Sequence, residues 1–200
     1  ARDRKSLSAS KRGFPFNGLT EIDSASEMNS MSSWKDEYRL LSYFSRLEYD
    51  YANKYYVSGS VRTDGSSRFH PDSRWGKFWS VGASWNLKNE DFLINVPQID
   101  LLKLKASYGT QGNDNVGYVT VYKDLYSVSR VDGVASISKA FRGAPDVTWE
   151  KSNNFNVGIE GRIFNRVSFN AEYFVKETKD MIYKRPLAPS QGTPGSQLVN

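Results

Sequence analysis

Residues 41–63 read LSYFSRLEYDYANKYYVSGSVRT, and this stretch decides the fold. Side-chain character alternates through both of its halves. In the first half an apolar set opposes a mainly polar set: Leu41, Tyr43, Leu47, Tyr49 and Tyr51 against Ser42, Phe44, Arg46, Glu48 and Asp50. Successive side chains of a strand point to opposite faces, so the pattern predicts two antiparallel strands, each with one apolar face. Residues 52–54 are short enough to be a hairpin turn between them.

Four further stretches alternate in the same way, at residues 79–87, 102–108, 155–163 and 167–175. The connections between the six stretches fall into two kinds. Residues 165–166 form a second tight hairpin, whereas residues 65–75 and 111–150 are long and rich in turn-forming residues. The sequence therefore predicts an all-β, antiparallel meander of about six strands, with all of its long connections leaving from the same end.

The strand length and the aromatic content favour a membrane barrel over a soluble sandwich. The alternating runs last about ten residues, close to the 9–11 that a tilted strand needs to cross a bilayer. Tyr43 and Tyr51 stand about 27 Å apart along their strand, and such rings prefer the headgroup level. The opposite face carries repeated charges, which suits a hydrated lumen. The bland explanation, a soluble carbohydrate-binding β-sandwich, stays open as the alternative, and solubility without detergent separates the two.

Composition excludes several kinds of chemistry. The 200 residues contain no cysteine and a single histidine, His70, so a disulfide framework, a thiol nucleophile and a histidine-rich metal site are excluded. The net charge of +5 is spread along the chain and marks no nucleic-acid partner. Glu48 and Asp50 share a face like a glycosidase pair, but neighbouring arginines favour an ion network instead. We expect no enzyme activity, no catalytic residue, no metal and no cofactor.

Several motifs, in order along the chain, resemble those of SusC/RagA-type TonB-dependent transporters. The best preserved are SYFSRLEYDY at 42–51, RTDGSSRF at 62–69, RWGKFWSVGASW at 74–85, LKLKASYGTQGN at 102–113 and WEKSNNFNVG at 149–158. Trp79 stands where this family usually has proline. Within RTDGSSRF we interpret Gly65 as the residue that supplies an unusual backbone angle where the strand bends into a loop.

The resemblance implies part of a transmembrane barrel of about 22 strands with an N-terminal plug, in the outer membrane of a Gram-negative, Bacteroidetes-type cell. Such barrels import nutrients, mainly oligosaccharides and in some members peptides. The implied partners are membrane lipid, a SusD-like surface lipoprotein and, through a plug that this chain does not hold, the TonB–ExbB–ExbD motor. We expect the chain to be a segment of the longer protein, without a signal peptide of its own.

The resemblance also suggests an organisation and a site. We expect an external loop or irregular segment at residues 1–36, the barrel segment at 37–183 and an external loop at 184–200. Sugar recognition uses aromatic faces beside polar groups, so the loop aromatics are the candidates for substrate contact. The four that we select are Phe69, Trp75, Tyr126 and Trp149; Tyr118, Tyr122 and Phe141 are weaker candidates. The competing interpretation is that these rings pack the loops against one another or lie at the headgroup level.

Overall fold

The computed structural model describes residues 1–131, 134–192 and 194–200. Nearly all of its regular structure is β. The strands are β1 (Arg2–Arg12), β2 (Glu27–Tyr38), β3 (Leu40–Tyr51), β4 (Tyr55–Ser66), β5 (Trp75–Asn86), β6 (Ile99–Asn113), β7 (Leu125–Val131), β8 (Val134–Phe141), β9 (Glu150–Ile163), β10 (Val167–Lys179), β11 (Tyr183–Pro186) and β12 (Ser196–Val199). The described residues also form single-turn 3-10 helices, none of which has the length or the apolarity to span a membrane.

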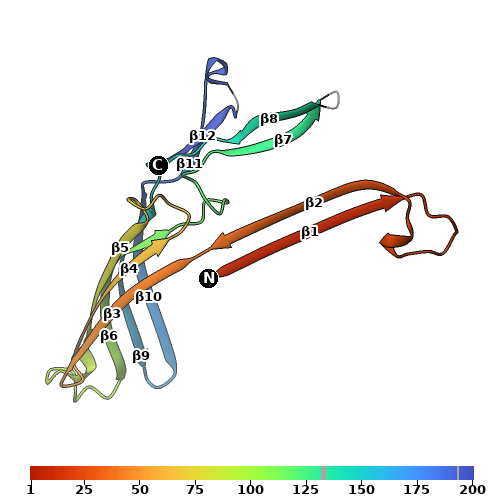
Figure 1. The fold of residues 1–200 in the computed structure, drawn as a ribbon. Coiled ribbons are helices and arrows are strands. Elements are labelled where there is room, and N and C mark those ends of the chain that lie inside the picture. Colours follow the sequence, from red (N-terminus) through yellow and green to blue (C-terminus); the bar gives the residue numbers. More distant parts are fainter. Residues whose placement is uncertain (132–133, 193) are drawn as a thin grey trace. The chain divides into compact units, whose positions relative to one another are not determined.

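Six strands form one antiparallel sheet in the order β10-β9-β6-β5-β4-β3, which confirms the predicted meander (Figure 1). The connections 52–54, 87–98 and 164–166 lie at one end of the sheet, which we call the turn end. The connections 67–74 and 114–149, and the residues after 179, lie at the other, which we call the loop end. The β7–β8 and β11–β12 hairpins belong to the loop end.

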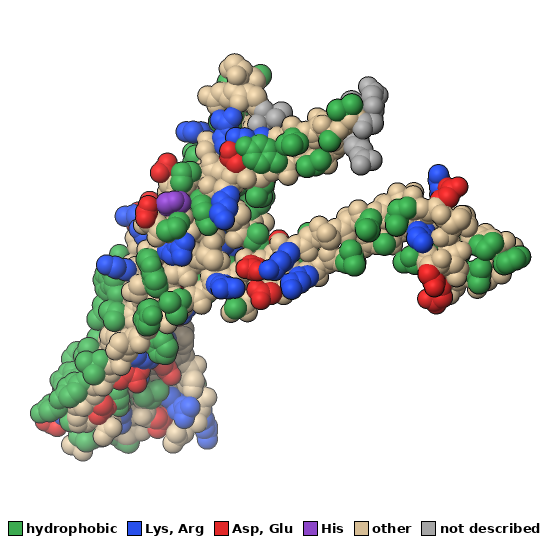
Figure 2. Space-filling view, in the orientation of Figure 1, with side chains coloured by type: hydrophobic (Ala, Val, Ile, Leu, Met, Phe, Trp, Pro, Cys, Tyr) green, Lys and Arg blue, Asp and Glu red, His purple; other side chains and the backbone are tan. Residues whose placement is uncertain are grey.

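The register carries the two faces through all six strands. One row of directly paired residues runs Tyr49, Val57, Ala83, Ala106, Val157 and Tyr173, and the next runs Glu48, Ser58, Gly82, Ser107, Asn156 and Phe174. No second layer of the described residues covers the apolar face: Leu47 is 75% exposed and Tyr173 64%. Hydrophobic side chains accordingly gather along the sheet in Figure 2. Within the described residues the sheet is therefore a single layer.

The apolar band runs diagonally across the strands. On β3 the apolar band extends to Tyr51. The row of paired residues that contains Tyr51 meets β10 at Ala171, but on β10 the band continues four residues further, to Val167. A slip of four residues over five strand spacings corresponds to a strand tilt of about 30°. That value lies near the 35–45° of membrane barrels, so the band is roughly level when the strands are tilted as in a barrel.

Both tight turns at the turn end use left-handed backbone. Ala52 and Asn53 have φ of 54° and 55°, and Phe164 and Asn165 have φ of 53° and 52°. Each turn has three residues, and the positive φ values of the first two are those of the type I′ turns whose twist matches that of the strands. The amide of Asn165 donates to Asp100 Oδ2 at 2.6 Å, across to the neighbouring connection. These turns pin the register of both hairpins.

A polar cluster around Glu90 closes the third connection of the turn end. The carboxylate of Glu90 accepts hydrogen bonds from Trp85 Nε1 at 2.9 Å and from Lys54 Nζ at 3.1 Å. Hydrogen bonding from the Tyr55 hydroxyl, then from Trp85 and Lys54, lowers the pKa of Glu90 below its ordinary value. The same contact with Glu90 raises the pKa of Lys54. The cluster ties the β3–β4 turn to the β5–β6 connection.

Outside the sheet, three hairpins stand where the sequence suggested loops. Residues 1–39 form a separate compact unit, with β1 and β2 paired from Arg2 and Tyr38 onward. That residues 1–36 are an external loop or irregular segment of the barrel stays a prediction. The long connection 114–149 contains the β7–β8 hairpin, and residues 184–200 include most of the β11–β12 hairpin. The strands β1 and β2 are long but weakly apolar, and the strands of the other two hairpins are short, so none of them has a distinct apolar face in the sequence.

Candidate functional site

A hydrophobic cluster at the loop end positions the candidate site. It is built mainly from the connections: Phe69, Phe78, Val121, Phe141, Ala144, Val147, Trp149 and Leu198. Trp149 lies at its centre, with ring centroids 5.6 Å from Phe69 and 5.5 Å from Phe78, and its Nε1 donates to the carbonyl of Arg74 at 2.7 Å. Three connections far apart in sequence are thereby held over the sheet end.

Two glycines make room for the Phe78 ring. A Cβ at Gly112 would lie 2.0 Å from Phe78 Cζ, and one at Gly76 would lie 2.4 Å from the same atom. Real Cβ atoms do not approach so closely, so any side chain at either position would displace the ring. The ring occupies the region where the pairing of β5 with β6 stops, above Ser80 and Gly109. The Phe78 ring thus fills the region where these two strands separate.

The RTDGSSRF stretch forms a polar network against this cluster. Ser66 is fully buried, and its hydroxyl donates to Asp114 Oδ2 at 2.7 Å. Arg68 Nη1 donates to the carbonyl of Asp114 at 2.7 Å, and lies 3.7 Å from its Oδ1. Our interpretation of Gly65 was wrong, because its φ is not positive. A Cβ at Gly65 would lie 2.9 Å from Trp75 Cζ3, so a larger residue there would displace the Trp75 ring.

Arg62 and Asp64, on the polar face of β4, form a closer ion pair than Arg68 and Asp114 do. Arg62 Nε donates to Asp64 Oδ1 at 2.8 Å and to Oδ2 at 2.7 Å. The Asp64 side chain is only 8% exposed, whereas the Arg62 side chain is 53% exposed. Arg62 Nη2 reaches Ser42 Oγ at 3.4 Å. The carboxylate of Asp64 is therefore the buried partner of the pair, and the guanidinium of Arg62 is the partner exposed to solvent.

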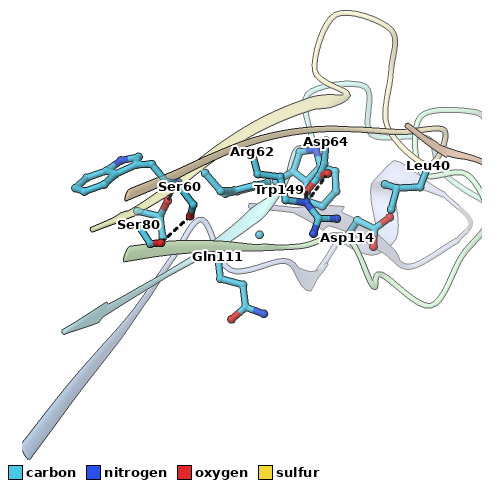
Figure 3. A pocket seen from close by; sticks show the side chains of 12 residues that line it. Leu40, Ser60, Arg62, Asp64, Ser80, Gln111, Asp114 and Trp149 are labelled. Carbon is cyan, nitrogen blue, oxygen red and sulfur yellow. Dashed lines mark hydrogen bonds and ion pairs between the residues drawn. The ribbon is translucent and has the colours of Figure 1, made fainter. Parts of the chain in front are cut away.

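These groups line a cavity of about 350 Å³ on the polar face, which we call the polar cup. The residues that give it its chemistry are Ser60, Arg62, Asp64, Ser80, Gln111 and Asp114, with Phe78 and Trp149 behind them. Figure 3 shows the Arg62–Asp64 ion pair and the hydrogen-bonded Ser60 and Ser80 hydroxyls, 2.7 Å apart. The cup offers hydrogen-bond donors and acceptors of both charges. Of the three aromatic residues that line it, Phe78 and Trp149 expose almost no surface, whereas Trp79 is 45% exposed.

The structure does not bring the four selected aromatics together. Phe69 has no exposed surface and Trp149 is 4% exposed, so neither ring offers a face to a ligand in this conformation. Trp75 lies on the apolar face and stacks on Tyr43 at 6.3 Å. Tyr126 is 57% exposed on β7, with Lys139 Nζ 5.7 Å from its ring centre. Only Trp149 lines the polar cup, and substrate contact by the four stays a prediction.

The weaker candidates and the charged residues have other places. Phe141 is buried against Tyr118, and Tyr122 meets His70 edge to ring. Arg46 pairs with Glu48 as expected, but Arg62 pairs with Asp64. Within residues 1–131, 134–192 and 194–200, no three His, Asp or Glu side chains gather as metal ligands would. The signal that could have found the cup is the RTDGSSRF motif itself, which places two opposite charges on one strand face.

The chain is similar to known proteins over most of its length. A family model described as TonB dependent receptor-like, beta-barrel matches residues 6–200. "TonB-dependent receptor P39" of Formosa agariphila is 32% identical over 88% of this chain and 17% of its own length. "TonB-dependent receptor SusC" of Bacteroides thetaiotaomicron is 29% identical over 86% of this chain and 18% of its own. The chain thus spans about a fifth of the relatives that it matches.

Solved structures give the same result for the fold. The RagAB peptide importer in its "closed-closed" state superposes with a TM-score of 0.90 at 31% identity, covering 99% of this chain and 22% of that one. The "open-open" state of the same importer gives 0.86 at the same identity and coverage. The sheet, its register and these matches agree, and the chain therefore belongs to the TonB-dependent receptor family, of whose β-barrel it forms a part.

Proposed function

We propose that this chain is part of the barrel wall and external vestibule of a nutrient importer in the outer membrane of a Gram-negative cell. The observation that carries the proposal is the sheet itself. Its apolar face is continuous over six strands and uncovered, while its other face is polar and includes the cup. A lipid bilayer outside and water inside satisfy both faces at once, since barrel strands alternate apolar outward and polar inward.

The proposed substrate and partners are based on the relatives. RagAB is named a peptide importer, and SusC is named a TonB-dependent receptor. We propose that the whole transporter imports an oligosaccharide or a peptide, captures it with a SusD-like surface lipoprotein, and is energised through TonB–ExbB–ExbD. The chain described here supplies wall and loops to that assembly. It is assigned no reaction, and no observation favours the sandwich alternative.

Import is tested by deleting the gene in its own host and measuring uptake of labelled peptide and glycan pools. We expect uptake of one pool to fall and to return when the full-length gene is restored. A restored gene carrying Val157→Asp, which places a charge at the centre of the apolar face, is expected to assemble poorly in the outer membrane. Asn156→Asp, the matched change on the polar face, is expected to assemble normally. Unchanged uptake of both pools would overturn the proposed function.

A further inference from the structure

The guanidinium of Arg62 is held by one edge and presented by the other. Its hydrogen bonds to Asp64 are made through Nε, at 2.7 and 2.8 Å, so the outer edge formed by the two Nη groups is not the edge that holds that carboxylate. The long Arg62 Nη2 contact with Ser42, at 3.4 Å, leaves room for a stronger acceptor. A guanidinium fixed in this way loses little conformational entropy on binding, and its paired N–H groups match the two oxygens of a carboxylate.

The other acid of the cup does not repel such a ligand strongly. One oxygen of Asp114 accepts the Ser66 hydroxyl at 2.7 Å, and the other lies 3.7 Å from Arg68 Nη1. Arg62, Arg68, Asp64 and Asp114 therefore balance in formal charge. With one presented guanidinium and two carboxylates nearby, a singly charged anion is favoured over a doubly charged phosphate.

A hydroxyl pair adds a further donor to the cup. Ser60 and Ser80 lie 2.7 Å apart across β4 and β5, and one hydroxyl donates to the other. The hydrogen of the accepting hydroxyl is not used within this pair, so it can serve a ligand oxygen. The cavity of about 350 Å³ has room for one sugar ring or one or two amino-acid residues.

From this arrangement we infer that the polar cup recognises a carboxylate on the imported molecule, with the Nη edge of Arg62 as its partner. The inference rests on the proposed function, which it deepens by naming the chemistry of the substrate. Two sources could supply the group, the C-terminus of a peptide or a uronic acid in an oligosaccharide. Asp64 acts as a positioning residue, because its carboxylate orients Arg62 through Nε.

The test measures binding to the purified full-length transporter by calorimetry, with two pairs of probes. One pair is a tetra-alanine peptide with a free or an amidated C-terminus. The other is tri-galacturonate and its methyl ester. We expect one pair to show at least tenfold tighter binding of the free carboxylate. Arg62→Gln should remove that preference by weakening the carboxylate probe alone, and Arg62→Lys should restore it only in part because a lysine lacks the fork.

Arg46→Gln is the matched control. Arg46 lies on the polar face of β3, is paired with Glu48 and does not line the cup, so the preference should persist in this variant. Arg62→Gln leaves Asp64 without its partner. The double variant Arg62→Gln/Asp64→Asn removes both charges, and we expect it to lose the carboxylate preference as well.

Three results would overturn the inference: no carboxylate preference in either pair, binding of neither pair, or an equal loss for charged and neutral probes in the Arg62 variants. Uptake distinguishes these from failure of the proposed function. If the host still depends on the transporter for peptide or glycan uptake, only the inference fails; if it does not, the proposed function fails.

Discussion

The turn end and the loop end of the sheet both close antiparallel strands, but with different contacts. At the turn end a three-residue turn and a short connection meet through Glu90, whose partners Trp85 and Lys54 are 5 and 36 residues away. At the loop end the tie is a buried apolar cluster, in which Trp149 bonds to Arg74, 75 residues away. One end is closed by polar contacts between short connections, and the other by apolar packing between long ones.

The turn end is therefore the fixed end of the sheet, whereas the connections of the loop end can be varied. The turn end has short segments that follow directly from strand geometry. The loop end gathers distant segments over a cluster, and the cluster holds Arg62, Asp64 and Asp114 around the polar cup. Binding residues are commonly found on connections that a rigid sheet positions, and this end fits that pattern.

Removing the centre of the apolar cluster should have the largest effect. We expect Trp149→Ala to cost about 3–5 kcal/mol in the stability of the loop end, because it leaves a cavity and frees the carbonyl of Arg74. Hydrogen exchange at the amides of Ser66 and Val121, which bond to Arg74 and Arg68, should rise. Trp75→Ala, on the exposed apolar face, is the control and should leave these amides protected. Unchanged exchange in Trp149→Ala would mean that the cluster does not hold the loops.

Breaking the buried polar network should have the next largest effect. We expect Ser66→Ala to cost about 1.5–3 kcal/mol, since it removes a hydrogen bond to the carboxylate of Asp114. Limited proteolysis of residues 114–124 should become faster. Ser127→Ala, which breaks an exposed hydroxyl pair on β7, should leave the rate unchanged. Equal rates in both variants would contradict a structural role for the network.

At the turn end, the contribution of Glu90 should depend on pH. Its pKa is lowered from 4.5, so its stabilising contacts are complete above pH 4.5 and are lost as the pH falls through the lowered pKa. We expect the amides of Lys54 and Asn86, compared after correction for intrinsic exchange, to lose protection on acidification in the wild type. In Glu90→Gln their protection should be lower at neutral pH and nearly independent of pH. A variant that keeps the wild-type pH profile would exclude Glu90 as the titrating group.

The smallest effect is expected from the exposed pair on β3. Arg46 and Glu48 are 64% and 63% exposed as side chains, and such pairs contribute at most about 1 kcal/mol. We expect Arg46→Gln to leave the urea-unfolding midpoint of the refolded transporter within error of the wild type. A larger shift of the unfolding midpoint would show that the charges on the polar face act as a network. The two ends would then differ less in the contacts that stabilise them.

The sequence predicts the sheet well and the site poorly, for a physical reason. Alternation has a period of two, so runs such as 41–51 and 167–175 reveal strand, face and register without knowledge of their neighbours. The tight turn at 52–54 follows from strand spacing alone. The β7–β8 hairpin has only a short apolar face, around Val128 and Ile137, and such a run does not stand out from a loop.

The aromatic candidates illustrate why the sequence predicts the site poorly. Phe69 and Tyr126 both sit in long connections, and their composition does not tell that one is buried and the other exposed. The distinction depends on contacts with residues many positions away, such as Trp149 beside Phe69. The charged pair Arg62 and Asp64 was visible in its motif, but its role depends on the folding of Asp114 and Trp149 around it.

The most direct test of the account is a cysteine scan along β9, in the full-length transporter and in intact cells. The segment described here has no native cysteine, so each introduced thiol can be read singly once any elsewhere in the protein are replaced. We predict that a small water-soluble thiol reagent labels cysteines at Asn154, Asn156 and Glu160, and spares those at Phe155, Val157 and Ile159. Labelling of both sets to the same extent would contradict the claim that one face of this sheet contacts lipid and the other contacts water.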